Sequence, residues 1–259
     1  MMKIFVMSGA GNDFVVLDAR GKQLDFEVLS KTLCAEFGTD GFMAVDVSES
    51  ADFRLHFYNS DGTRGEMCGN GARCICKFAY DQGLVGEKMT VQTDAGLVYG
   101  VRLGENHYRV QLNNPGAVDL QCHPMAAYVE LGNPGVPHSV TELKGLEWED
   151  KGILLPVFME IRNAPEFPKG VNVNLYRKLS DTAVRILTFE RGVEDYTLAC
   201  GTGSASVAVV LWLRGELPGG HLTVENPGGT LKVTVEGQNG QVTALYLEGP
   251  AEVVARYEV

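Results

Sequence analysis

Two short, mainly apolar runs that end in a polar residue occupy corresponding places in the two halves of this chain. Residues 53–59 read FRLHFYN, and residues 184–190 read VRILTFE. Both patterns predict half-buried β-strands that end in a polar residue. Each is followed by a Gly-rich turn and then by a largely apolar stretch, at residues 72–82 and 204–214. We expect each of these stretches to form a central, buried helix that ends at a glycine.

Strand-turn-strand signals follow both predicted helices, over residues 89–98 and 222–231. Two further helices are predicted over residues 26–37 and 151–163. We place Pro156 in the first turn of the latter, because a helix tolerates proline there. The order strands, helix, strands, helix, strands therefore occurs twice along the chain.

A short motif marks the same duplication. Cys68-Gly69-Asn70-Gly71 and Cys200-Gly201-Thr202-Gly203 are 132 residues apart, about half of the 259-residue chain. Each motif begins 15 residues before a glycine, Gly83 in the first half and Gly215 in the second. The agreement of motif, helix and glycine indicates an internal repeat.

We therefore predict an α/β fold of the α+β type with two pseudo-symmetric domains of duplicated topology. The predicted domains are residues 1–113 and 114–248, with a turn-rich boundary at residues 113–116. The last strand, residues 249–259, is expected to return to the first domain. The alternative is a single irregular domain in which the repetition arises by chance.

Composition and charge narrow the class of protein. The chain is 45% hydrophobic and carries a formal net charge of −11, so it can bury a full core without disulfides. The negative charge opposes binding to nucleic acid or to anionic membranes. We expect a small-molecule substrate and no nucleic-acid or membrane partner. The apolar run in residues 1–7 is too short for a signal peptide or a membrane span, so we expect a cytoplasmic protein.

The six cysteines do not follow the pattern of a secreted disulfide framework. Cys68, Cys74 and Cys76 lie close together in sequence, but they form no C-x-x-C pair and no histidine lies near them. We therefore expect reduced thiols and no metal site.

A cysteine at a helix N-terminus suits acid/base chemistry. Only the thiolate is a useful base, and the free N–H groups and partial positive charge of a helix N-terminus favour an anion. Cys68 and Cys200 could remove a proton from one face of an amino acid's α-carbon and return one to the other face. The same N–H groups would stabilise the charge on the substrate carboxylate, so inversion needs neither pyridoxal phosphate nor a metal.

Two alternatives exist for this pair of motifs. Both cysteines could be buried structural residues, which is the common fate of a free cysteine. The glycines could also cradle a phosphate, but neither motif has the ending of a P-loop and no G-x-G-x-x-G follows a strand.

The motifs resemble those of the diaminopimelate epimerase family over nearly the whole chain. The stretches that carry the resemblance are residues 9–14 (GAGNDF), 59–62 (NSDG), 67–74 (MCGNGARC), 167–172 (FPKGVN), 190–192 (ERG), 199–203 (ACGTG) and 227–229 (PGG). The resemblance implies a cofactor-independent isomerase that interconverts LL- and meso-diaminopimelate on the route to lysine and peptidoglycan. It also implies two domains, each a curled, mainly antiparallel sheet around a central helix, with the active site in the cleft between them. A homodimer is a separate expectation that no sequence feature determines.

The resemblance assigns roles residue by residue. Cys68 and Cys200 would be the acid/base pair, with His138 and Glu190 as further catalytic residues. The positions that match substrate contacts are Asn12, Asn59, Gly69, Asn70, Asn133, Asn172, Glu190, Arg191, Gly201 and Thr202. Arg191 would grip the distal carboxylate, and Glu190 or the amide side chains would take the distal ammonium. Taken singly, Asn12 and Asn59 could be turn residues, and Glu190 with Arg191 could be a surface ion pair.

One stretch departs from the family pattern Gly-Asn-Pro-His, because residues 132–138 read GNPGVPH. Either Asn133 keeps the substrate contact and His138 is displaced, or Gly135-Val136-Pro137-His138 is the true match and valine replaces asparagine. We favour the second match because it needs no insertion and keeps His138 near the site.

Two other functions fit the same residues. One is a two-thiol racemase of the same superfamily that acts on another amino acid, such as histidine or a proline derivative. The other is a non-catalytic redox-sensing or binding protein in which Cys68 and Cys200 form a reversible disulfide.

Overall fold

The computed structural model describes residues 2–65, 67–133 and 135–258. The chain divides into two compact units, one made of Met1–Gln111 with Glu248–Val259 and the other of Leu112–Leu247. The chain thus leaves the first unit near residue 111 and returns to it at residue 248. The predicted domain limits, at residues 113, 114, 248 and 249, stay a prediction.

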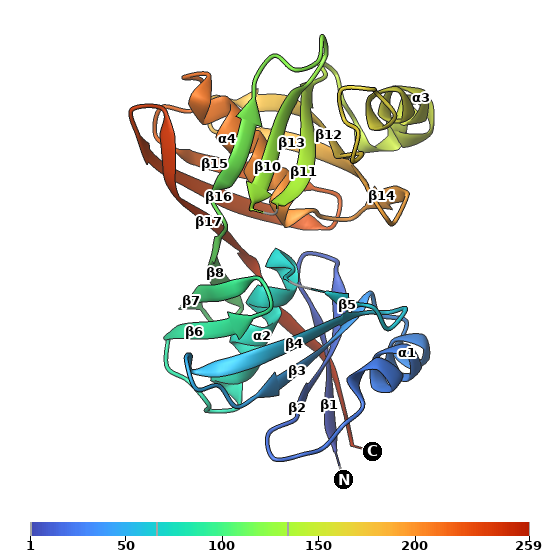
Figure 1. Cartoon of the computed structure of the whole chain (residues 1–259), viewed down its shortest axis with the longest axis vertical. Coiled ribbons are helices and arrows are strands. Elements are labelled where there is room, and N and C mark those ends of the chain that lie inside the picture. Colours follow the sequence, from blue (N-terminus) through green and yellow to red (C-terminus); the bar gives the residue numbers. More distant parts are fainter. Residues whose placement is uncertain (1, 66, 134, 259) are drawn as a thin grey trace. The chain divides into compact units, whose positions relative to one another are not determined.

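The first unit is a mixed sheet with two helices (Figure 1). Strands β18, β1 and β2 pair antiparallel, as do β3 with β4, β6 with β7, and β7 with β8. The parallel pairs β2–β3 and β4–β6 are each joined through a helix, α1 and α2 respectively. The elements are β1 (Lys3–Ser8), β2 (Asp13–Asp18), α1 (Phe26–Phe37), β3 (Gly41–Asp46), β4 (Phe53–Asn59), β5 (Arg64–Gly65), α2 (Gly69–Asp81), β6 (Lys88–Thr93), β7 (Gly96–Gly104), β8 (His107–Leu112) and β18 (Glu252–Glu258).

The second unit repeats the same order of pairings. Strands β9, β10 and β11 pair antiparallel, and β11 pairs parallel with β12 across α3. Strand β13 pairs antiparallel with β12 and parallel with β15 across α4, and β15 forms a hairpin with β16. The elements are β9 (Pro115–Asp119), β10 (Ala127–Gly132), β11 (Gly135–Glu142), η1 (Trp148–Asp150), α3 (Lys151–Arg162), β12 (Asn172–Ser180), β13 (Ala183–Glu190), β14 (Asp195–Thr197), α4 (Gly201–Leu213), β15 (His221–Asn226), β16 (Gly229–Gln238) and β17 (Gln241–Pro250).

One helix in each unit is enclosed on all sides. Every residue of α2 from Gly69 to Ala79 is buried, and nearly every residue of α4 from Gly201 to Leu211 is buried as well. Helix α2 packs on β2, β3 and β7, whereas α1 packs on β2, β3 and β4. Because both helices pack on β2 and β3, these two strands are almost continuously apolar and do not alternate apolar with polar residues.

Two glycines let strands cross closely over the buried helices. A Cβ at Gly100 on β7 would collide with Cys76 of α2, and one at Gly237 on β16 would collide with Trp212 of α4. A side chain at either position would push the strand away from the helix. Each glycine therefore allows a strand to pack closely on the buried helix of its own unit.

The structure confirms most of the predicted elements and corrects three details. Helix α1 and strand β4 have the predicted limits. Helices α2 and α4 begin three residues earlier than predicted, because the glycines of each motif form the first helical turn. Pro156 lies in the second turn of α3, so its predicted place in the first turn is wrong. Proline removes a hydrogen bond to the carbonyl of Gly152, but both residues are exposed and water can take its place.

Among the described residues, no helix is long and apolar enough to cross a membrane. The six cysteines are present as thiols and not as disulfides.

Candidate active site

Cys68 is the N-cap residue of the buried helix α2. Its backbone is extended, with φ −130° and ψ 125°, and its carbonyl accepts the first helical hydrogen bond from Ala72 at 2.7 Å. The N–H groups of Gly69, Asn70 and Gly71 then belong to the first turn, where a helix offers no acceptor. The thiol therefore stands beside a set of donors suited to an anion.

Asn12 orients the thiol of Cys68. Cys68 Sγ lies 3.6 Å from Asn12 Oδ1, and Asn12 Nδ2 donates to Asp40 Oδ2 at 2.6 Å. Because the Asp40 carboxylate can only accept, it holds the amide of Asn12 with its oxygen toward the sulfur. The backbone N–H of Asp13 also donates to Asp40 Oδ2, at 2.8 Å. Asp40 therefore fixes the loop that carries Asn12, although no motif in the sequence marked Asp40.

Arg73 secures the first turn of α2 from inside the core. Its guanidinium is fully buried and donates to Gly69 O at 3.3 Å, to Asn70 Oδ1 at 3.0 Å and to Pro250 O at 3.2 Å. Burial lowers the pKa of Arg73. The side chain of Asn70 is held inward by this guanidinium, and Asn70 stays a predicted substrate contact through the amides of its loop.

Cys200 is presented in the same way at the start of α4. It is the N-cap residue, with φ −112° and ψ 109°, and Sγ accepts a hydrogen bond from Gly203 N at 3.3 Å. Thr202 Oγ1 lies 3.5 Å from the same sulfur. Cys200 is only 7% exposed, so α4 offers its thiol a shielded site with an aligned N–H donor.

Asn172 and Arg191 form a second group in the unit of Cys200. Asn172 Oδ1 accepts from Arg191 N at 2.8 Å, and Asn172 Nδ2 donates to Pro137 O at 3.2 Å. The guanidinium of Arg191 is exposed and donates to Lys169 O at 2.9 Å. The side chain of Asn172 therefore holds the turn that carries Arg191. This structural role is separate from the predicted contact with substrate.

His138 lies on β11 directly opposite Asn172 of the parallel strand β12. It is fully buried, and its Nδ1 lies 3.2 Å from Nδ2 of Asn174. Burial, together with the charge of Arg191, lowers the pKa of His138 to about 3. The ring is therefore neutral at physiological pH.

The remaining predicted residues lie at or next to the ends of strands. Glu190 is the half-buried last residue of β13, and Asn59 ends β4 with its amide donating to Thr63 Oγ1 at 2.9 Å. Asn133 is exposed between β10 and β11. Val136 is 41% exposed on β11, and Pro134, which belongs to the same departing stretch, lies outside the described residues.

The other cysteines are not built for acid/base work. Burial raises the pKa of both Cys74 and Cys76 to about 12. Burial also raises the pKa of Cys34 and Cys122. None of the four is the N-cap of a helix, which separates them from Cys68 and Cys200.

Alkylation should reveal this difference. We expect iodoacetamide at pH 8 to label Cys68 well before Cys74 and Cys76, because thiols with a pKa of about 12 and no exposed surface offer almost no thiolate. Peptide mass spectrometry over a time course measures the order, with the urea-unfolded chain as the control in which all six thiols react. Equal labelling of Cys74 and Cys68 in the folded protein would contradict this assignment.

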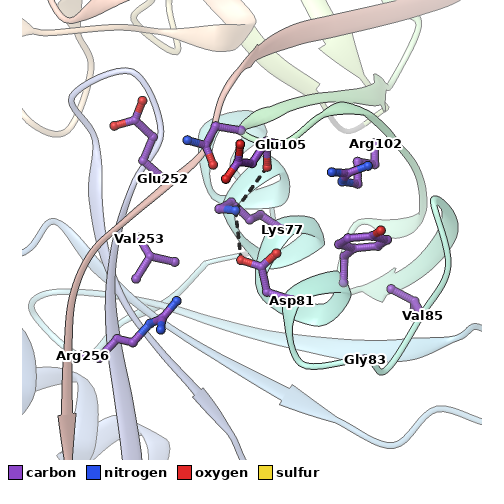
Figure 2. A pocket seen from close by; sticks show the side chains of 11 residues that line it. Lys77, Asp81, Gly83, Val85, Arg102, Glu105, Glu252, Val253 and Arg256 are labelled. Atoms are coloured by element: carbon purple, nitrogen blue, oxygen red, sulfur yellow. Dashed lines mark hydrogen bonds and ion pairs between the residues drawn. The ribbon is translucent and has the colours of Figure 1, made fainter.

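A pocket in the first unit lies at the other end of α2 (Figure 2). Lys77 Nζ at its floor pairs with Asp81 Oδ2 at 2.9 Å and donates to Glu105 O at 3.2 Å. Lys77 lies nine residues after the N-cap Cys68, so the nearest part of the pocket is about 13.5 Å from the N-cap along the helix axis at 1.5 Å per residue. The contacts of Lys77 anchor the C-terminal half of α2. The pocket is not at the N-terminal end of the helix, where Cys68 lies.

Solved structures of other proteins share this fold. A phenazine biosynthesis protein of the PhzF family from Bacillus anthracis has a TM-score of 0.73 at 16% identity, covering 100% of this chain and 98% of that one. A hydroxyproline epimerase from Agrobacterium vitis has a TM-score of 0.71 at 16% identity, covering 99% and 91%. At this level of identity the likeness defines the fold class, an α/β architecture rich in sheet.

Sequence comparison gives the family. A sequence profile named diaminopimelate epimerase matches residues 4–116 and 130–254. Diaminopimelate epimerases from Aquifex aeolicus and Chlorobaculum tepidum are each 36% identical, the first covering 83% of this chain and 82% of its own length, the second 96% and 98%. The chain belongs to the diaminopimelate epimerase family, and it is an isomerase.

Proposed function

We propose that this protein interconverts LL- and meso-diaminopimelate by a two-cysteine mechanism without a cofactor. The single observation that supports the mechanism is the matched presentation of Cys68 and Cys200, each the N-cap of an enclosed helix. The names of its relatives support the substrate.

The reaction needs one thiolate and one thiol on opposite faces of the substrate α-carbon. The thiolate takes the α-proton, the electron pair of the C–H bond passes to the carboxylate, and the thiol delivers its proton to the other face. N–H groups at the helix ends stabilise the charge that develops on the carboxylate. The product leaves with the two sulfurs in exchanged protonation states, so the reverse reaction starts from that state.

The local contacts of the thiols suggest which one is protonated at rest. Asn12 Oδ1 can only accept, so Cys68 is a thiol where it faces this oxygen at 3.6 Å. Cys200 Sγ accepts from Gly203 N, an arrangement that suits a thiolate. We propose that Cys200 is the base and Cys68 the acid toward the first stereoisomer bound by the resting enzyme.

We propose that residues of the second unit, which contains Cys200, recognise the distal end of the substrate. Arg191, with its turn fixed by Asn172, offers a guanidinium for the distal carboxylate. Glu190 at the end of β13 offers a carboxylate for the distal ammonium. Asn59, Asn133 and Thr202 stay proposed substrate contacts, as do the backbone N–H groups of Gly69, Asn70 and Gly201.

Incubation with LL-diaminopimelate in heavy water tests the function directly. Purified protein without added cofactor should produce meso-diaminopimelate that carries deuterium at the inverted carbon, as measured by NMR and mass spectrometry. No inversion and no deuterium uptake in reduced protein would overturn the proposal and favour a redox or binding role for the two thiols.

Arg191→Ala should lower kcat/KM for diaminopimelate about 10- to 100-fold, because it removes a charged hydrogen bond to the distal carboxylate. Lys232→Ala is the matched control, since it removes an exposed cation on β16 of the same unit. Steady-state kinetics measures both variants. Unchanged kcat/KM in Arg191→Ala would favour a racemase for an amino acid without a distal carboxylate.

We also propose that the enzyme works in the cytoplasm, in lysine and peptidoglycan precursor synthesis, and forms a homodimer. The net charge of −11 supports a small-molecule substrate over nucleic acid. Light scattering of the purified protein tests the dimer.

A further inference from the structure

Asn174 lies at the centre of the buried polar cluster in the second unit, although no motif marks it. It is on β12, two residues after Asn172, and is fully buried. Its side chain contacts backbone carbonyls, a hydroxyl, an imidazole and the first turn of α4. Those partners are Ser139 O, Asn172 O, Thr188 Oγ1, His138 Nδ1 and Gly203.

The carbonyl partners fix which way the amide of Asn174 faces. Its Nδ2 lies 2.9 Å from Ser139 O and 3.1 Å from Asn172 O. Carbonyl oxygens can only accept, so the NH₂ group must point toward them. Its Oδ1 then accepts from the hydroxyl of Thr188 at 3.0 Å. If the amide were flipped, its oxygen would face the two carbonyl oxygens, and these hydrogen bonds would be lost.

This orientation also fixes the tautomer of His138. Nδ2 of Asn174 lies 3.2 Å from His138 Nδ1, and an amide NH₂ does not accept a hydrogen bond. A proton on Nδ1 would point at this NH₂ group, so Nδ1 is the bare nitrogen of the neutral ring and the proton is on Nε2. The two N–H donors of Asn174 are shared among Ser139 O, Asn172 O and Nδ1. Nε2 is buried, and no residue that the structure describes accepts its hydrogen bond. The ring thus holds an N–H donor without an acceptor.

The same amide touches the turn that carries Cys200. A Cβ added at Gly203 would collide with Oδ1 of Asn174, so the amide oxygen rests directly against the residue at position 203. Gly203 N in turn donates to Cys200 Sγ at 3.3 Å. One side chain therefore borders both the histidine and the sulfur's hydrogen-bond donor.

We propose that Asn174 is a positioning residue that holds His138 with its proton on Nε2 and seats the first turn of α4 beneath Cys200. The Nε2–H group is then a fixed donor for an acceptor atom that arrives with the substrate, such as a carboxylate oxygen. His138 acts through this hydrogen bond and transfers no proton. The proposal rests on the proposed epimerase function only for its consequences in turnover.

The tautomer can be measured without any activity. In the full-length protein labelled with ¹⁵N at histidine, we expect a pyridine-type shift for His138 Nδ1 and a pyrrole-type shift for Nε2, unchanged between pH 5 and pH 8. Asn174→Ala should allow both tautomers. The matched control is Asn226→Ala, because Asn226 is a buried asparagine of the same unit that bonds Ser204 and Val224 instead. A proton on Nδ1 in the unmodified protein would overturn the proposal.

Kinetics separates positioning from proton transfer. His138→Gln places an amide N–H near the position of Nε2 and should keep at least about a tenth of kcat with an unchanged pH profile, whereas His138→Asn lacks that donor and should lose about 10- to 100-fold. Asn174→Ala should lower kcat by a similar factor, with urea unfolding used to confirm that it folds.

Each outcome has a distinct meaning. Equal loss in His138→Gln and His138→Asn would overturn the donor role even if Asn174→Ala does not fold. If the tautomer is as expected but the protein does not epimerise diaminopimelate, the proposed function fails while the assignment of Asn174 and His138 stands.

Discussion

Cys200→Ala and Cys68→Ala should each lower the rate of epimerisation at least about 10³-fold, the largest effect expected of any single substitution. Proton transfer by a positioned group contributes about 10²- to 10⁴-fold, and each thiol takes part in one of the two transfers that an inversion requires. Water is a poor replacement for either thiol, because each thiol is aligned by its own helix end and Cys200 is only 7% exposed.

The stereochemical outcome gives this prediction its sharpest form. A variant with one remaining thiol can at most remove and return a proton on the same face, so any residual deuterium exchange should retain configuration. Cys122→Ala is the control, since Cys122 is a half-buried thiol outside any helix N-terminus. Chiral chromatography after incubation in heavy water measures the result. Inversion by either single variant at more than about a tenth of the normal rate would exclude the two-thiol mechanism.

Arg73→Leu should destabilise the first unit by about 3–5 kcal/mol, the largest effect expected on stability. Leucine fills part of the volume but removes the guanidinium's hydrogen bonds to Gly69 O, Asn70 Oδ1 and Pro250 O. Each hydrogen bond to a charged group contributes about 1.5–3 kcal/mol, and relaxation around three neighbouring acceptors makes the sum less than additive.

Urea unfolding followed by circular dichroism measures the change in free energy. Arg256→Leu is the matched control, because Arg256 is an exposed arginine of the same unit, and it should change stability by less than about 1 kcal/mol. A loss below about 1 kcal/mol for Arg73→Leu would mean that water or a rearranged turn satisfies the three acceptors. Because Arg73 secures the turn after Cys68, the folded fraction of this variant should also show reduced activity.

Elements whose signals are local were predicted well. Helix α1 and strand β4 have the expected limits, because the caps and the alternation that define them lie within a few residues. The first turns of α2 and α4 were missed since glycine has a low intrinsic helix propensity. Burial of Gly69 and Gly201 within the core overrides that propensity.

In the candidate site, too, local signals were predicted from the sequence and long-range contacts were not. The cysteine motifs were found from sequence because each is a contiguous tetrapeptide. Asp40, Arg73 and Asn174 were missed because the partners that give them meaning are distant in the chain: Asn12, Pro250 and His138 lie 28, 177 and 36 residues away. A buried polar residue has no local pattern, so only its tertiary neighbours reveal it.

The sequence by itself determined the repeated order of elements, the two thiols and the glycines that start their helices, because these features depend on short-range pattern and backbone freedom. Only the tertiary structure decided that Cys68 faces an accepting oxygen, that Cys200 faces a donating N–H, and that His138 is a buried neutral ring. Such differences between matching positions depend on desolvation and on contacts between strands far apart in the chain, which no local pattern encodes.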